Sequence, residues 1–168
     1  YSCGYSVAKR ETPLMNADST KKPEQAVKQS RCCTFLIADK CFAFDSDLVI
    51  EVLQKGVINK VPLASPAISG LLNLRGRIVP VIDLRTFLKF SPASPSIQQI
   101  NIIVDIRNEW YCFLVDQLLD VTAYDSHQIT PPSNALLDVI TGVLPTISHL
   151  IHFLSPEKSE IALQEMLR

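Results

Sequence analysis

Residues 70–84 read Gly-Leu-Leu-Asn-Leu-Arg-Gly-Arg-Ile-Val-Pro-Val-Ile-Asp-Leu. Two apolar runs rich in strand-forming residues, 71–74 and 78–82, flank a short polar centre. The stretch therefore predicts a hairpin that turns at Gly76, because glycine adopts positive φ without steric cost. Pro80 has no backbone N–H to donate to a sheet, so we expect it at an edge or a bulge. The sequence thus predicts a rigid β scaffold that displays an arginine at its tip.

The same stretch carries the series Gly-x-x-Asn-Leu-Arg-Gly-x-x-x-Pro-Val-x-Asp-Leu. In this it resembles the CheW-like domain family, the adaptor fold of bacterial chemotaxis, because every fixed position of the family's hallmark segment is present. Residues 42–53 are similar to markers of the family's first subdomain, and residues 115–143 to markers of its second. The resemblance covers residues 32–167.

The resemblance implies a fold, a function and partners. The implied fold is two five-stranded, SH3-like or OB-like β-barrels packed side by side. The implied function is an adaptor, not an enzyme, that couples chemoreceptors to a CheA-type histidine kinase in receptor arrays. Its partners would be the kinase regulatory domain, the cytoplasmic tips of methyl-accepting chemoreceptors and, in rings, other CheW-like domains. No cofactor or metal is implied, and the protein would be cytoplasmic and recruited to membrane-associated arrays.

Outside the hallmark stretch, short apolar runs alternate with polar turns. Asp45 is predicted to open a helix, because apolar residues follow it at three- and four-residue steps and Gly56 supplies a stop. Ser65 is expected to cap one helical turn, and Ser155 to cap a final helix over 156–167. The predicted strands are 33–37 and 41–44, which form a hairpin, and 57–61, 100–106, 110–115, 118–124, 139–144 and 150–154.

Many short strands separated by turn signals predict an all-β protein, although the pattern alone leaves barrel and sandwich both open. Residues 1–31 are polar without sustained periodicity and are expected to form a flexible extension of the folded part, 32–168. Residues 91–99 contain two prolines among small polar residues and predict a connector. We therefore expect two intertwined subdomains, 32–90 and 100–155.

The charge distribution bears on the class of partner. Residues 1–31 carry six Lys or Arg against three Asp or Glu, whereas the remainder carries ten against fourteen. An acidic body disfavours a nucleic-acid-binding small barrel, the most distant alternative, because such a surface needs clustered cations. No apolar run approaches the roughly 20 residues that span a bilayer, so membrane insertion is not expected. A scaffold of a related pathway, such as twitching motility, and a fragment of a larger CheW-containing protein remain alternatives.

The cysteines and histidines point to no catalytic or metal site. The five cysteines, Cys3, Cys32, Cys33, Cys41 and Cys112, show no metal-ligand spacing and are expected to be mostly buried, reduced thiols. Cys112 and His127 could form a nucleophile and base, but no oxyanion element accompanies them. His149 and His152 are expected to point to opposite faces of a strand, which disfavours shared metal ligation.

Ten residues are candidates for partner binding: Val49, Glu51, Gly70, Asn73, Arg75, Gly76, Asp83, Asp116, Leu118 and Gly142. Arg75 could capture a partner carboxylate or brace the fold by pairing with Glu51 or Asp83. Asp83 is also expected to cap a helix over 84–88. Asp116 could lie at a partner-facing edge, as the resemblance implies, or could accept backbone donors at a strand end.

Simple structural roles compete with binding at two of three further positions. The resemblance implies that Val49 and Gly70 contact the kinase or the receptor and that Gly142 lies beside an interaction surface. Val49 could instead be a core residue of its predicted helix, and Gly142 could allow close backbone approach at a strand.

Overall fold

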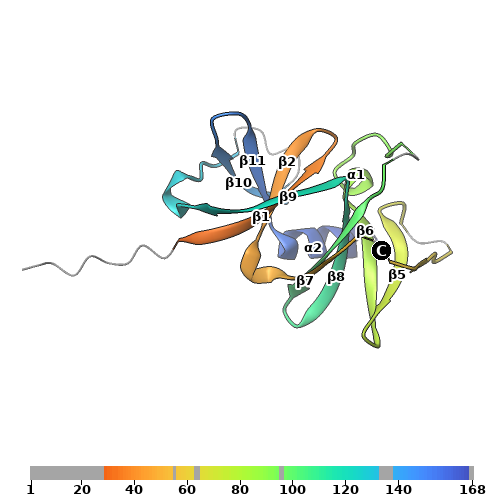
Figure 1. Cartoon of the computed structure of the whole chain (residues 1–168). Coiled ribbons are helices and arrows are strands. Elements are labelled where there is room, and N and C mark those ends of the chain that lie inside the picture. The colour runs from red at the N-terminus through yellow and green to blue at the C-terminus, as the bar shows by residue number, and fades with distance from the viewer. Residues whose placement is uncertain (1–28, 55, 63–64, 95–96, 133–137, 167–168) are drawn as a thin grey trace, which may run out of the picture.

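The computed structural model describes residues 29–54, 56–62, 65–94, 97–132 and 138–166. Two antiparallel-rich sheets account for most of them, with few helices, which confirms the all-β fold (Figure 1). The first sheet has the order β10-β11-β2-β1-β9 and comprises β1 (Ser30–Ile37), β2 (Lys40–Asp45), β9 (Gln117–Tyr124), β10 (Ile140–Pro145) and β11 (Leu150–Leu154).

The second sheet has six strands rather than the expected five, in the order β3-β7-β8-β6-β5-β4. It comprises β3 (Val49–Leu53), β4 (Ile58–Asn59), β5 (Ile68–Leu74), β6 (Arg77–Asp83), β7 (Ile100–Ile106) and β8 (Glu109–Val115). The helical elements are η1 (Ser46–Leu48), α1 (Leu84–Phe87), η2 (Ser126–Gln128) and α2 (Pro156–Met166). Within the described residues, no helix has the length and apolar character needed to cross a bilayer.

The connector over residues 91–99 does not separate the two sheets, because each sheet contains strands from both sides of it. The first sheet is built from the two ends of the described chain and the second from its middle, so a division into 32–90 and 100–155 does not match sheet membership. The reason is that one hairpin of each half joins the sheet formed mainly by the other half. Strand β2 pairs in parallel with β11, and β8 pairs in parallel with β6. Each sheet therefore contains strands from both sides of the connector.

Three hairpins turn through two residues that both have positive φ. These pairs are Ala38 and Asp39, Arg75 and Gly76, and Arg107 and Asn108. Such turns match the right-handed twist of the flanking strands. The Asn73 side chain steadies the predicted turn, because its Oδ1 accepts the Gly76 N–H at 3.1 Å. The hairpin at Gly76 is thus confirmed.

The helix predicted after Asp45 is wrong. Asp45 caps only the short η1, by accepting the Asp47 N–H at 3.1 Å, and the chain then continues as β3. Strand β3 pairs with β7, and its register shifts between Val49 and Glu51. The shift breaks the two-residue alternation of a regular strand, so the apolar residues acquire the three- and four-residue spacing of a helix.

Two neighbouring predictions also differ from the structure. The strand expected over 57–61 contains only the two residues of β4. The helical turn expected after Ser65 is a tight turn, closed by a bond from the Ile68 N–H to the Ser65 carbonyl at 2.8 Å. The later strands and the helix that follows Ser155 are confirmed, apart from shifts of a residue or two at their ends.

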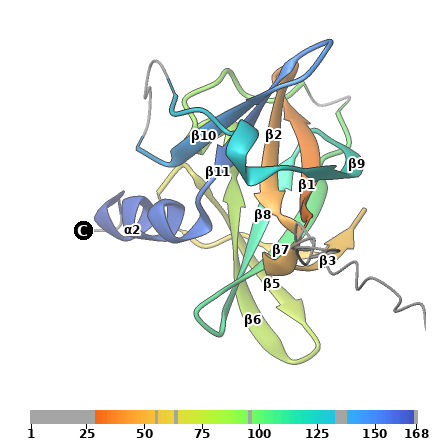
Figure 2. The same ribbon diagram turned by 90° about the vertical axis from the view of Figure 1, so that its left-hand side faces the viewer.

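The main hydrophobic core lies where the two sheets meet. Phe44 of β2 contacts Phe35 of β1 and Phe113 of β8, with ring centroids 5.1 and 5.0 Å apart, so one aromatic cluster joins both sheets. Helix α2 lies to one side of the sheets and inserts Leu163 into this core (Figure 2). Because both sheets pack on this core, their relative position is fixed, and so is the position of the surfaces between them.

Candidate interaction surface

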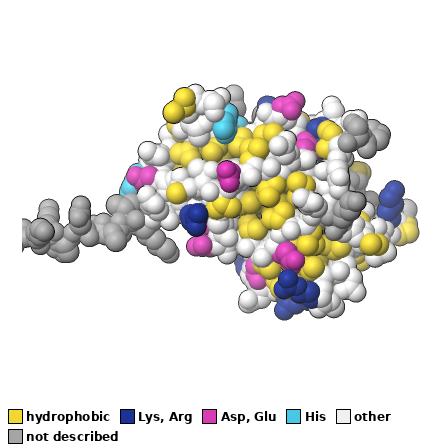
Figure 3. Space-filling view, viewed as in Figure 1, with side chains coloured by type: hydrophobic (Ala, Val, Ile, Leu, Met, Phe, Trp, Pro, Cys, Tyr) yellow, Lys and Arg dark blue, Asp and Glu magenta, His cyan; other side chains and the backbone are white. Residues whose placement is uncertain are grey.

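An apolar groove of about 370 Å³ lies between η1 and β3 on one side and β9 on the other. We call it the β3–β9 groove. It is lined by Cys33, Ser46, Val49, Val52, Leu118, Leu119, Asp120 and Val121. Figure 3 shows hydrophobic side chains gathered across the centre of the face on which β9 lies in Figure 1. The groove therefore has one wall from each sheet.

Both walls are edge strands with exposed apolar side chains. β3 ends the order of the second sheet and β9 ends the order of the first. Val121 is 48% exposed, and Leu119 and Ile50 are also exposed. The exposed apolar side chains at this seam make the groove a candidate site for another molecule. Two predicted binding residues, Val49 and Leu118, line this groove, although their role in binding stays a prediction.

Four of the other predicted binding residues lie together, three in the β5–β6 hairpin and one, Glu51, on β3. The Arg75 Nη2 lies 2.8 Å from the Glu51 Oε2, and the two side chains are 68% and 27% exposed. Asn73 and Gly76 complete the turn that displays Arg75. Because Glu51 is on β3 and the hairpin belongs to the other end of the same sheet, this ion pair links opposite ends of a curled sheet.

Gly70 and Gly142 are buried and serve close packing. A Cβ at Gly70, where φ is +148°, would lie 2.3 Å from the Asn59 carbonyl oxygen. A Cβ at Gly142 would lie 2.2 Å from the Ile129 Cγ2. The close approach predicted for Gly142 is therefore present, although the neighbouring atom belongs to a side chain.

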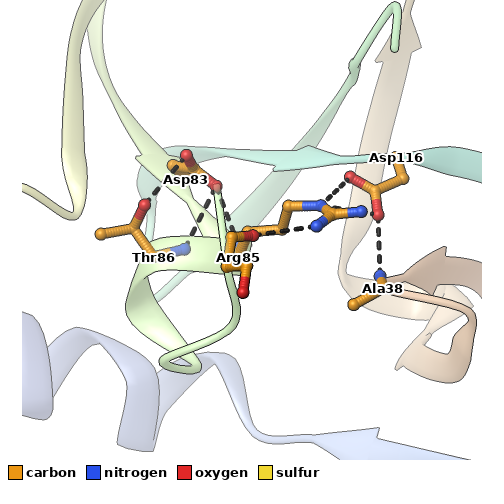
Figure 4. Close-up of polar contacts among 6 residues, drawn as sticks. Ala38, Asp83, Arg85, Thr86 and Asp116 are labelled. Carbon is orange, nitrogen blue, oxygen red and sulfur yellow. Dashed lines mark hydrogen bonds and ion pairs between the residues drawn. The ribbon is translucent and has the colours of Figure 1, made fainter. Parts of the chain in front are cut away.

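Asp83 and Asp116 are held by contacts within the fold (Figure 4). Asp83 caps α1 as predicted, because its carboxylate accepts the Arg85 N–H at 2.9 Å and the Thr86 hydroxyl at 3.1 Å. The Asp116 carboxylate accepts the Ala38 N–H at 2.8 Å and binds the Arg85 Nε at 2.8 and 2.9 Å. The structural reading of Asp116 as an acceptor of backbone donors is therefore confirmed.

Arg85 is a structural side chain that the sequence analysis did not single out. The Arg85 and Asp116 side chains are only 13% and 10% exposed, and Arg85 also donates to the Ser91 carbonyl at 2.9 Å. The hydrogen bond that Arg85 donates to the Asp116 carboxylate raises the pKa of Arg85, so the guanidinium stays charged. This buried pair joins α1 to the β1–β2 turn and to the start of β9. No local pattern links residues 31 positions apart, so no sequence signal could have identified it.

The cysteines that the structure describes are buried thiols. Cys32, Cys33, Cys41 and Cys112 are free and buried, and Cys3 lies outside the described residues. Burial raises the pKa of Cys112 to about 12, and its thiol donates to the Asn101 Oδ1 at 3.3 Å. A buried thiol with so high a pKa is a poor nucleophile, which contradicts the pairing of Cys112 with the exposed His127. No group of three or more potential metal ligands occurs among the described residues.

Comparison with known proteins gives the family. The model of the CheW-like domain matches residues 31–159. The chain belongs to the CheW-like family. It is 31% identical over 144 residues to the chemotaxis protein CheW of Thermotoga maritima, which covers 83% of this chain and 95% of that protein. It is 26% identical over 124 residues to Protein FrzA of Myxococcus xanthus, which covers 71% of this chain and 77% of that protein.

A solved structure of the CheW-like family has the same fold. The scaffolding protein TtCheW from Thermoanaerobacter tengcongensis superposes with a TM-score of 0.71 at 28% sequence identity. The match covers 76% of this chain and 89% of that protein. The two-sheet architecture described above is therefore the CheW-like fold.

Proposed function

We propose that this chain is a chemotaxis adaptor that couples chemoreceptors to a CheA-type histidine kinase and transforms no substrate itself. It would work in the cytoplasm, recruited to membrane-associated receptor arrays. The observation that carries the proposal is the β3–β9 groove, an apolar channel with one wall from each sheet, in a member of the CheW-like family. A rigid frame of this kind transmits signals by holding partners at fixed relative positions.

The groove suits an amphipathic helix from the cytoplasmic tip of a chemoreceptor. A helix presents apolar side chains at three- and four-residue steps along one face, and such a face binds an apolar groove through a few anchor residues. Val49, Val52 and Leu118 supply the apolar walls that these anchors would contact.

A separate surface would bind the kinase regulatory domain. The far side of the second sheet ends at the two-residue strand β4, beside which Val57 is 80% exposed and Val61 is exposed as well. An edge with exposed apolar residues is open to pairing with another β domain. We assign the kinase contact to this edge, which would leave the groove free for the receptor. Contacts with other CheW-like domains in rings would use the same kind of edge.

The test of the proposed function is a groove variant, Val121→Glu. We expect it to lower the affinity for receptor-tip fragments at least tenfold, because a carboxylate would be buried against the apolar face of the helix. Binding of the kinase regulatory domain should be unchanged. Both affinities are measured by calorimetry with fragments encoded in the same genome.

The matched control for the groove variant is Ile147→Glu, at a fully exposed apolar residue in the turn between β10 and β11. This variant makes the same chemical change outside the groove and should bind the receptor fragment as the wild type does. Equal receptor affinity of the Val121→Glu and wild-type chains would contradict the proposal. A fragment from another signalling array that bound in place of the chemoreceptor would indicate a scaffold of a related pathway.

Arg75 provides an independent prediction. We expect Arg75→Glu to weaken receptor binding while the fold survives, because the substitution removes an exposed ion pair worth at most about 1 kcal/mol and places a carboxylate beside Glu51. Receptor binding and circular dichroism are measured together. Arg107→Glu is the control, since Arg107 is exposed and has positive φ at the neighbouring β7–β8 turn. Wild-type receptor binding by a folded Arg75→Glu chain would assign Arg75 to bracing alone.

A further inference from the structure

A β-bulge shapes the β9 wall of the groove. On β1, Cys33 lies opposite Val121 and Phe35 lies opposite Leu118, so the single residue Thr34 faces two residues of β9, Leu119 and Asp120. In a regular strand, alternate side chains would point away from the groove. With the extra residue, four consecutive residues, 118–121, border the groove.

Thr34 holds this bulge in place. Its side chain is buried, and its hydroxyl donates to the Asp120 carbonyl at 2.7 Å and accepts the Asp120 N–H at 3.1 Å. One hydroxyl thus satisfies both backbone groups of Asp120, which the bulge removes from the regular ladder. The bulge is therefore a defined conformation that holds Asp120 at the border of the groove.

Asp120 is the one charged residue among those that line the groove. Its Oδ1 accepts the Val121 N–H at 3.2 Å, and the ion pairs found among the described residues do not include it. A helix that covers the groove would remove water from this carboxylate. Loss of water from a carboxylate is unfavourable unless a cation or hydrogen-bond donor on the partner replaces it.

We propose that Asp120 selects the partner of the groove by its charge. The segment that binds is an amphipathic helix with a Lys or Arg at the border of its apolar face, placed to pair with the Asp120 carboxylate. A helix with Glu or Asp at that position is rejected by repulsion between like charges. This inference rests on the proposed receptor-binding function and adds to it the charge that the receptor helix must carry.

The test uses the full chain and receptor-tip fragments encoded in the same genome. We expect Asp120→Asn, which keeps the shape and removes the charge, to lower the affinity at least fivefold at low salt. The salt dependence of binding should also become flatter, because one charge pair has been lost. Asp47→Asn is the control, since Asp47 is exposed on η1 next to Ser46 but does not line the groove.

A charge exchange makes the test specific. Asp120→Lys should abolish binding of the wild-type fragment, and a Lys→Glu or Arg→Glu substitution in the fragment should restore it. Thr34→Val, which removes the hydroxyl and keeps the side-chain shape, should lower the affinity at least threefold in a folded chain, because the bulge loses its support.

The outcomes separate this inference from the proposed function. If Val121→Glu loses the fragment but Asp120→Asn binds it like the wild type at every salt concentration, the selection by charge is wrong and the groove remains the receptor site. If the wild-type chain binds none of the fragments, both proposals are wrong.

Discussion

Replacing Asp116 with alanine is expected to lower the free energy of unfolding by about 3–5 kcal/mol, the usual cost of removing one partner of a buried ion pair. The substitution would leave the largely buried Arg85 guanidinium without its carboxylate and the Ala38 N–H without its acceptor. Chemical denaturation with fluorescence from Trp110 measures the change.

The exposed pair between Arg75 and Glu51 supplies the control for this prediction. Its N–O distance is the same, 2.8 Å, but its side chains face water, so Glu51→Ala should cost at most about 1 kcal/mol. Replacement of both buried partners, Arg85→Met with Asp116→Leu, should recover much of the lost stability, because no unpaired charge remains. Equal losses for Asp116→Ala and Glu51→Ala would refute the assignment of Asp116 as a buried structural contact.

Loss of the buried pair should also destabilise the β9 wall of the groove. Asp116 directly precedes β9, and its N–H donates to the Leu36 carbonyl at 3.0 Å. The pair therefore fixes the point at which the β9 wall begins. In Asp116→Ala we expect the groove residues Leu118 to Val121 to lose protection from hydrogen exchange earlier than the β5–β6 hairpin.

The second large effect is expected at Gly70. Gly70→Ala should cost about 2–6 kcal/mol, because two unfavourable terms combine: backbone strain at φ +148° and overlap of the new Cβ with the Asn59 carbonyl oxygen. Neither can relax easily, since the colliding atom belongs to the backbone of β4, the neighbouring strand. Thermal and chemical unfolding of the variant measure the cost.

Gly76→Ala is the matched control for Gly70→Ala. Gly76 also has positive φ, +82°, but a Cβ there would meet nothing within 4 Å. Only the backbone strain remains, so we expect a cost of about 1–2 kcal/mol. Similar losses of stability in the two variants would show that overlap with β4 does not add to the cost of a side chain at residue 70.

Local features of the chain were largely predictable from sequence. The hairpin turn at Gly76, the cap that Asp83 gives α1 and the helix after Ser155 all follow from the preferences of single residues. The exception is the segment after Asp45, where a bulge gave a strand the apolar spacing of a helix. Such a bulge depends on pairing with β7, some 50 residues away, so the local pattern could not reveal it.

The sequence by itself determined the all-β class, the turns and the CheW-like family, because these depend on residue types and on short spacings along the chain. Only the tertiary structure decided that the halves exchange hairpins, that Arg85 pairs with Asp116, and that Val49 and Leu118 face each other across one groove. The physical reason is that these contacts join residues 31 to 111 positions apart. Their partners are selected by the packing of two sheets around a shared core, and no residue's local preference encodes that choice.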